Sequence, residues 1–307
     1  MSNPANAVRL TTSQWWPYLI FGIGILAGST GPIFLRLAQA EFVPSPIMTA
    51  FRLTIAALTF TPLVLRRYQA ELRRLRKRDF VIALAAGGIF SIHFTFVFES
   101  YKFTSILIAG VLIGSIPLWT ALIERFILHV HLGRTIWIGL GVALAGGAMI
   151  SLSGIMASTD LGSGILIGGS LALTGAVLGA IYLVTGRTLR NHISFVPYVW
   201  LIFTSAAVIS LLTVVVGGYS LSGYSPEGYF WVLMSTIFPQ IIAHGSFNYV
   251  LAYLPATLIS LSGQLTNVIG AAAAFFIFAE LPGPLQIIGS AVIIVGVVMV
   301  IFGQSKE

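Results

Sequence analysis

Two histidines are the most informative polar residues, because each lies in a long apolar stretch and the two stretches are similar. His93 belongs to residues 92–96 (IHFTF) and His244 to residues 243–247 (AHGSF), 151 positions further along. Inside a bilayer, such a ring either faces a cavity or hydrogen-bonds a neighbouring helix. The pair therefore predicts two equivalent positions that line a central cavity or brace helices. An imidazole at either position can bind a proton near neutral pH.

The similarity extends over both halves of the chain. Leu107-Ile108 corresponds to Leu258-Ile259, and four spaced positions recur after a one-residue slip: Gly139, Val142, Gly146 and Met149 as Gly289, Val292, Gly296 and Met299. The sequence therefore predicts two repeats, residues 1–154 and 155–307. Glycines at such spacing predict close helix packing. Paired repeats in an apolar chain are typical of secondary transporters, with the solute site between the halves.

Composition excludes most other classes. The chain is 57% hydrophobic and only 8% charged, which is too little polar surface for a soluble globule. Cysteine is absent, the nine carboxylates are scattered, and no phosphate-binding glycine loop occurs. We therefore expect an integral membrane protein with no metal, no cofactor and no nucleic-acid partner.

Apolar stretches of about 20 residues, the length that crosses a bilayer, give the expected architecture. We predict an all-α polytopic membrane protein of ten transmembrane helices. The ten predicted spans are 16–37, 47–65, 80–98, 104–128, 135–152, 164–185, 195–216, 229–250, 255–279 and 284–302.

The distribution of positive charge predicts the orientation. Of the 16 basic residues, 13 fall in segments that share one side of the membrane if the N-terminus is cytoplasmic, and seven of these lie in residues 66–79. Short cytoplasmic loops hold the Lys and Arg excess, so both termini are expected inside and the two halves are inverted copies. The segment 66–79 is expected to be a loop on the anionic lipids of the cytoplasmic face.

Several motifs resemble the EamA-type branch of the drug/metabolite transporter superfamily. They are Arg52 early in the second span, Pro117-Leu118-Trp119-Thr120 in the fourth, Tyr182 in the sixth and Glu280 after the ninth, combined with a glycine-spaced closing helix in each half. The resemblance covers about residues 17–302. It implies export of amino acids or related metabolites across a bacterial inner membrane by a monomer or a homodimer. His129 stands where the family often has a glutamate, and 27–29 (AGS) where it often has a tryptophan.

Polar and aromatic residues inside the spans are the candidate solute contacts. Ser260, Gln264 and Asn267 share one helical face, where they either contact solute or join helices. Further candidates are Ser115 and Trp119 in the fourth span, Tyr182 in the sixth, Phe247 and Tyr249 in the eighth, and Thr30 in the first.

Prolines and charges inside spans are candidate gating or structural elements. Pro32 and Pro117 each remove a backbone hydrogen bond and predict a bend. Arg52 needs a partner, which is a solute carboxylate, Glu41, Glu99 or a helix end. Glu99 is expected to pair with Lys102, and Glu124 either contacts a gate or extends to the surface.

The sequence thus favours a secondary transporter that works by alternating access, with coupling to protons left open. Drug or cation efflux and exchange of nucleotide-related solutes are the alternatives among transporters. A membrane-embedded enzyme needs convergent acid–base residues, and a non-transporting subunit needs no central polar cavity.

Overall fold

The structure is a computed structural model that describes residues 15–103, 106–155, 165–278 and 283–304. All regular elements in these residues are helices. Nine helical segments are long and apolar enough to cross a membrane, and Arg134–Ile150 forms a shorter apolar helix at the position of the predicted fifth span. The prediction of an all-α protein with ten transmembrane helices is confirmed.

The helices of the first repeat supply its five spans, three of which consist of more than one element. They are α1 (Trp16–Ser29) with α2 (Gly31–Ala40), α3 (Ser45–Leu63) with η1 (Val64–Tyr68) and α4 (Gln69–Arg74), α5 (Lys77–Phe103), α6 (Ile106–Ile113) with α7 (Ile116–Phe126), and α8 (Arg134–Ile155).

The second repeat follows the same order. Its helices are α9 (Ile165–Arg190), α10 (Phe195–Val216), α11 (Pro226–Ser235) with η2 (Thr236–His244) and α12 (Gly245–Val250), α13 (Ala256–Phe278), and α14 (Pro284–Gln304).

Packing between these helices has the symmetry of an inverted repeat. Helix α9 of the second repeat packs on α5 of the first. In the same way α1 and α2, the counterparts of α9, pack on η2, α12 and α11, which are the counterparts of α5. Likewise α7 packs on α9 as α13 packs on α1. In three other pairs, a helix of the first repeat packs on its own counterpart in the second repeat: α3 on α10, α7 on α13, and α8 on α14. The two repeats therefore share one interface along the whole bundle instead of forming separate bodies.

Glycines bring α8 and α14 into backbone contact. A Cβ added at Gly146 would lie 2.6 Å from the carbonyl oxygen of Gly289, and one at Gly139 would lie 2.7 Å from that of Gly296. The same holds on α14. A Cβ added at Gly289 would lie 2.7 Å from the carbonyl oxygen of Gly146, and one at Gly296 would lie 2.6 Å from that of Gly139. The predicted close packing of these recurring glycines is confirmed.

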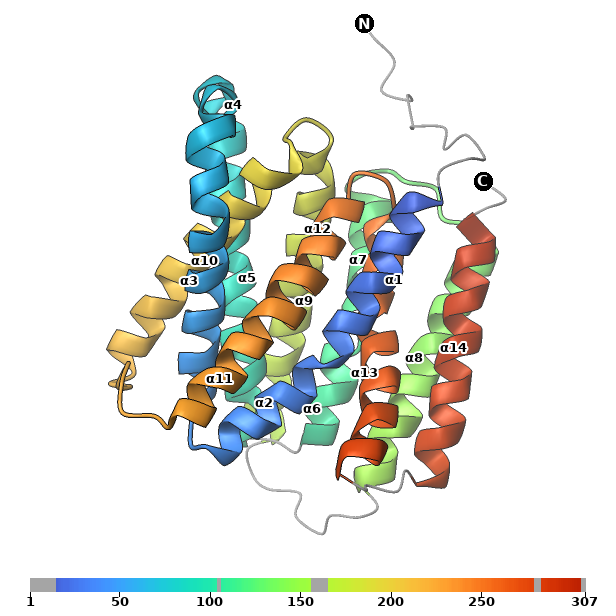
Figure 1. The fold of residues 1–307 in the computed structure, drawn as a ribbon. Coiled ribbons are helices and arrows are strands. Elements are labelled where there is room, and N and C mark those ends of the chain that lie inside the picture. Colours follow the sequence, from blue (N-terminus) through green and yellow to red (C-terminus); the bar gives the residue numbers. More distant parts are fainter. Residues whose placement is uncertain (1–14, 104–105, 156–164, 279–282, 305–307) are drawn as a thin grey trace, which may run out of the picture.

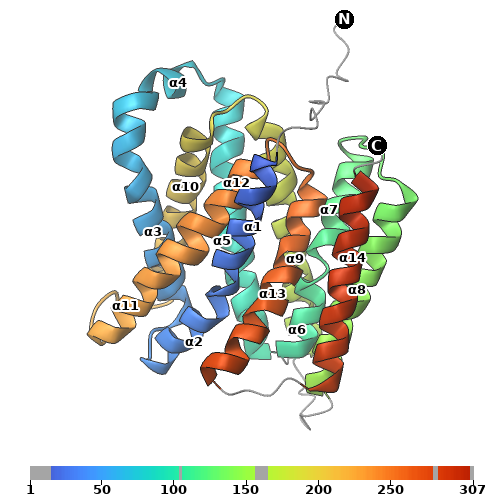
Figure 2. The ribbon, with the colours of Figure 1, turned by 45° about the vertical axis from the view of Figure 1, so that its right-hand side comes forward.

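The basic segment 66–79 is mostly helical, so the expectation of a loop is wrong. Helix α3 continues through the widened turn η1 into α4, and only two residues separate α4 from α5. No glycine or proline lies between Leu63 and Asp79, and Gln, Ala, Glu, Leu and Arg are strong helix formers. Helix α4, the start of α1 and the end of α14 lie at one end of the bundle, and α2 and α11 at the other (Figures 1 and 2).

Three spans are irregular near their middle. The first is interrupted at Thr30, two residues before Pro32, and the fourth at 114–115, just before Pro117. The eighth contains the π-helical stretch η2, which includes Pro239. Proline removes one helical hydrogen bond and crowds the preceding turn, and π-helical turns frequently occur at functional sites.

Replacing Gly146 with valine is expected to destabilise the protein by about 1–3 kcal/mol, because the added side chain would force α8 and α14 apart. Gly141 on the same helix has nothing within 4 Å of an added Cβ, so Gly141→Val is the matched control. Thermal unfolding in detergent should show a lower midpoint for Gly146→Val alone. Equal midpoints for the two variants would show that the glycine contact contributes nothing to stability.

Candidate functional site

A central cavity of about 260 Å³ lies where the two repeats meet. Both repeats line it, and its wall combines aromatic, aliphatic and polar side chains. The lining includes Gly28, Gly31, Arg52, Phe90, His93 and Ile116 from the first repeat, and Gly179, Tyr182, Pro239, His244, Phe247, Ile259, Ser260 and Thr266 from the second. Six residues selected from the sequence are thus brought together: Arg52, His93, Tyr182, His244, Phe247 and Ser260.

His93 is held from α5 against α9. Its Nδ1 lies 2.7 Å from the carbonyl oxygen of Gly175. A carbonyl oxygen only accepts, so Nδ1 donates, and in the neutral ring Nε2 is an acceptor. The bond fixes the ring at the edge of the cavity, so His93 both braces two helices and lines the cavity.

His244 lies among aromatic rings instead of being held by a polar partner. Its ring centroid is 5.2 Å from that of Phe90 and 6.1 Å from that of Phe247, both edge-on. Phe90 also stacks on Tyr182 at 4.4 Å. These rings form an apolar wall beside the imidazole, a combination suited to a solute with one apolar and one polar part.

Arg52 reaches the cavity from α3. One Nη2 hydrogen bond, 3.1 Å long, goes to Oε1 of Gln240, and the guanidinium lies 5.8 Å from the ring centroid of Phe94. Its Nε is buried without a hydrogen-bond partner, as is Nε2 of Gln240. Within the described ranges, no carboxylate pairs with Arg52, and Glu41 instead accepts a hydrogen bond from Ser225.

Two glycines that were not among the candidate solute contacts line the cavity at equivalent positions of the two repeats. A Cβ at Gly179 would lie 3.1 Å from the His93 ring, and one at Gly28 would lie 2.9 Å from Thr266. Gly28 and Gly179 are 151 positions apart, the same offset as the two histidines.

Tyr182 contributes its ring to the cavity, while its hydroxyl is used elsewhere. The hydroxyl donates to Oδ1 of Asn248 at 2.7 Å, and the Asn248 amide donates to the carbonyl of His244 at 2.8 Å. Arg190 also donates to the carbonyl of Asn248. Asn248 is fully buried and joins α9 to α12. No sequence signal distinguished it from other polar residues of the eighth span.

Gln264 and Asn267 lie at a second, smaller cavity of about 90 Å³, away from the histidines. The Gln264 amide donates to the carbonyl of Gly114 at 2.9 Å. This bond joins α13 to the interruption between α6 and α7. Gly114 has no side chain to block the approach, whereas an added Cβ would lie 3.0 Å from Gln264 Nε2. In this arrangement the amide joins the repeats and does not reach the central cavity.

Four other candidates do not line the central cavity. The Trp119 indole donates to Ser115 Oγ at 3.1 Å, so these two side chains bond each other. Thr30 bonds the carbonyl of Ala27, and the Tyr249 hydroxyl lies 3.5 Å from that of Tyr253.

Glu124 is fully buried at the end of α7 and does not extend to the surface. Its carboxylate pairs with Arg187 of α9 and accepts hydrogen bonds from the backbone N–H groups of Ala256 and Thr257, at 2.9 and 3.0 Å. The Thr257 hydroxyl donates to it as well. An acidic group at a helix N-terminus is favourable, and here it joins three helices from both repeats. Sequence reasoning missed Arg187 because its partner lies 63 positions away.

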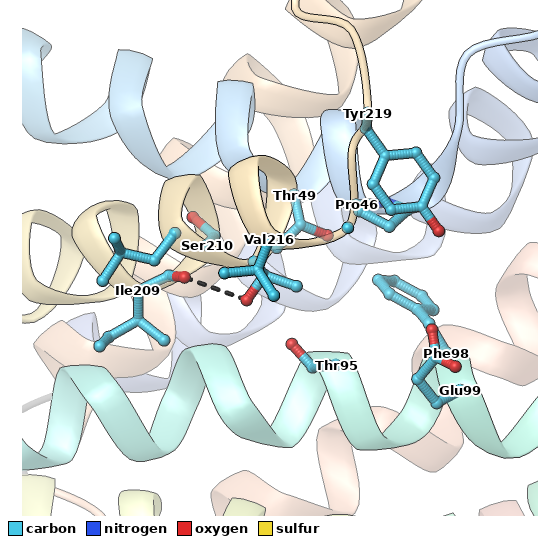
Figure 3. Close-up of a pocket in the computed structure, with 12 residues that line it drawn as sticks. Pro46, Thr49, Thr95, Phe98, Glu99, Ile209, Ser210, Val216 and Tyr219 are labelled. Carbon is cyan, nitrogen blue, oxygen red and sulfur yellow. Dashed lines mark hydrogen bonds between the residues drawn. The ribbon is translucent and has the colours of Figure 1, made fainter.

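Glu99 lines a separate groove of about 540 Å³ at the periphery, between α3, α5 and α10. Figure 3 shows Thr95, Phe98 and Glu99 of α5 facing Val216 and Tyr219 across it. Val216 is 87% exposed, so this groove opens outward from the bundle, unlike the cavity between the repeats. The side chain of Lys102, the partner expected for Glu99, lies outside the described residues.

The helix irregularities meet at the central cavity. Gly31, Ile116 and Pro239, which line it, lie at the interruptions of the first and fourth spans and in η2. A small cavity at a repeat interface, lined by helices that are broken at its level, is the arrangement of a solute site in a secondary transporter.

Comparisons with known proteins agree with this geometry. An uncharacterized transporter, YdfC of Bacillus subtilis (strain 168), is 24% identical over 190 residues, which are 62% of this chain and 60% of the relative. A crystal structure described only as that of a protein superposes with a TM-score of 0.79 at 21% identity, covering 95% of this chain and 98% of the other. That likeness shows a shared fold.

The family comparison is decisive, because it covers both repeats. The model of the EamA-like transporter family matches residues 14–152 and again residues 166–302. Together with the apolar helices, it makes this an integral membrane transporter. The chain belongs to the EamA-like transporter family.

Proposed function

We propose that this protein exports small metabolites that carry a carboxylate, amino acids or related compounds, across a bacterial inner membrane. The observation that supports this proposal is Arg52, a cation at the central cavity that has no carboxylate partner among the described residues. A solute carboxylate supplies that partner, and charge-assisted bonds to a guanidinium are short and strong.

Cavity size and sign of charge favour this solute over the alternatives. At about 260 Å³ the cavity is smaller than the ~300–1,000 Å³ typical of sites for drug-sized ligands. A buried guanidinium repels cationic drugs, and the apolar wall formed by Phe90 and Phe247 suits a hydrocarbon side chain. An amino acid with a hydrocarbon side chain fits the volume, the charge of the guanidinium and the apolar wall, whereas a nucleotide is too large for the volume.

In the proposed cycle, the halves rock about the cavity and the Glu124 contact closes its cytoplasmic side. Glu124 belongs to the last turn of α7, and this end of α7 lies at the same end of the bundle as α4 and the start of α1 (Figure 1). With both termini inside, that end is cytoplasmic. Opening this side requires α7, α9 and α13 to separate, which breaks the pair with Arg187 and exposes the first N–H groups of α13.

Transport in reconstituted vesicles tests the solute class. Leucine should be transported and leucinamide, which lacks the carboxylate, should not be, and a nucleoside and a cationic drug complete the panel. Arg52→Gln should lower leucine transport at least about tenfold, since a hydrogen bond to a charged group contributes ~1.5–3 kcal/mol. Arg52→Lys should retain part of the rate because it keeps the charge.

The matched control is His192→Gln, which alters a titratable residue far from the cavity. Normal leucine transport by Arg52→Gln, or equal transport of leucine and leucinamide, would refute carboxylate recognition. A variant that transports nothing and melts early would report misfolding, and Arg52→Lys then decides the question.

Proton coupling through the two histidines is the second prediction. The double variant His93→Gln, His244→Gln should transport more slowly and lose the pH dependence of the rate between about pH 5 and 8, where imidazole titrates. His131→Gln, an exposed histidine, should leave the pH profile unchanged. If the double variant keeps the profile and loses only stability, the rings brace helices and carry no coupling proton.

The third prediction concerns Glu124. Since the chain has no cysteine, a single cysteine at Ser260 reports access to the cavity without background. Glu124→Gln should speed its labelling by an impermeant reagent from the cytoplasmic side, because the neutral amide cannot form the ion pair with Arg187. Glu227→Gln, an exposed carboxylate in α11, is the control. Unchanged labelling with a lower melting temperature would make Glu124 a helix cap and not a gate.

A further inference from the structure

A groove larger than the proposed solute cavity lies outside that cavity, at the α4 end of the bundle. It has a volume of about 980 Å³ and is bounded by the α4–α5 connection, the end of α7 and the outer face of α9. Helix α9 packs on both α5 and α7, so it forms the floor between them. The groove shares no lining residue with the central cavity.

The groove has two chemically different parts. Its wall is aliphatic, with Ile82 of α5, Ile123 and Ile127 of α7 and Ile181 of α9 among its members. Ile127 is 68% exposed, which indicates that the wall faces hydrocarbon. A groove of this kind accepts an acyl chain running parallel to the helices.

The rim of the groove is strongly basic. Arg74, Arg76 and Arg78 all line it and are exposed. The one carboxylate of the lining, Asp79, lies 3.3 Å from His192 Nε2 and supplies one negative charge against three arginines, so the rim keeps a net positive charge. Three guanidinium groups above an aliphatic wall match an anionic phosphate head group attached to an acyl chain.

We propose that this groove binds one anionic phospholipid, with its phosphate between Arg74, Arg76 and Arg78 and an acyl chain along the wall of α5, α7 and α9. The site is distinct from general attraction of the basic segment to the membrane surface. Arg66, Arg67 and Arg73 lie in the same segment, are equally exposed, and do not line the groove.

Native mass spectrometry of the detergent-purified full chain, titrated with phosphatidylglycerol or phosphatidylcholine, tests the site. One phosphatidylglycerol should bind at least about tenfold more tightly than phosphatidylcholine. The triple variant Arg74→Gln, Arg76→Gln, Arg78→Gln should lose this preference. The triple variant Arg66→Gln, Arg67→Gln, Arg73→Gln removes the same charge and should keep it within about twofold.

Two further arms separate the lipid from its head group. Glycerol phosphate at millimolar concentration should not displace phosphatidylglycerol, and Ile127→Ser should weaken lipid binding without affecting folding, because Ile127 is already exposed. Equal losses in the two triple variants, displacement by glycerol phosphate, or no preference between the lipids would each overturn the proposal. If the groove variant melts early, Ile127→Ser alone decides.

Discussion

The absence of water in the bilayer is the constraint on which the rest of this structure depends, because each buried polar group must find a partner inside the protein. Most do so locally. Thr95 and Thr120 bond carbonyls of their own helices, and Tyr182 of α9 bonds Asn248 of α12 within the second repeat. Arg52 departs from this pattern, since its guanidinium has five N–H donors and a single hydrogen bond within the described residues. Such a group is costly to bury without partners, and under the proposed function a solute carboxylate supplies the partner that it lacks.

Because the repeat is inverted, a contact at one end of the bundle can be compared with the equivalent position at the other end. The two ends differ in the contact made by Glu124. Glu124 joins α7 to α9 and α13 at the α4 end. The position 151 residues later is Phe275, which has no carboxylate to pair with an arginine or to cap a helix. The glycine contacts of α8 and α14, by contrast, are equal in both directions. The halves are thus symmetric in their glycine packing and asymmetric at Glu124, so the two closed states of the proposed alternating-access cycle would be held by different forces.

Hydrophobic length and repeat spacing predicted the ten spans, the glycine contacts and the position of His93 and His244, because these features depend on the local chain and its copy. Partners distant in sequence were not predictable. Gln240 for Arg52 and Arg187 for Glu124 are polar residues of ordinary type, and only packing brings them together. Ser260 and Gln264 share a helical face, yet they meet different cavities. They are one turn apart, about 6 Å along the axis, and α13 passes from the central cavity to Gly114 within that distance.

The distribution of rigid and broken helix accounts for how the cavity can be both small and accessible. Helices α8 and α14 are in backbone contact through glycines, and neither contributes to the central cavity. The interruption at Thr30, the one at Ser115 and the π-helical stretch around Pro239 all border it. Bending a helix costs least where a backbone hydrogen bond is already missing. In the proposed cycle, changes in shape are therefore expected to concentrate at the wall of this cavity, while the glycine-packed pair keeps the two repeats together.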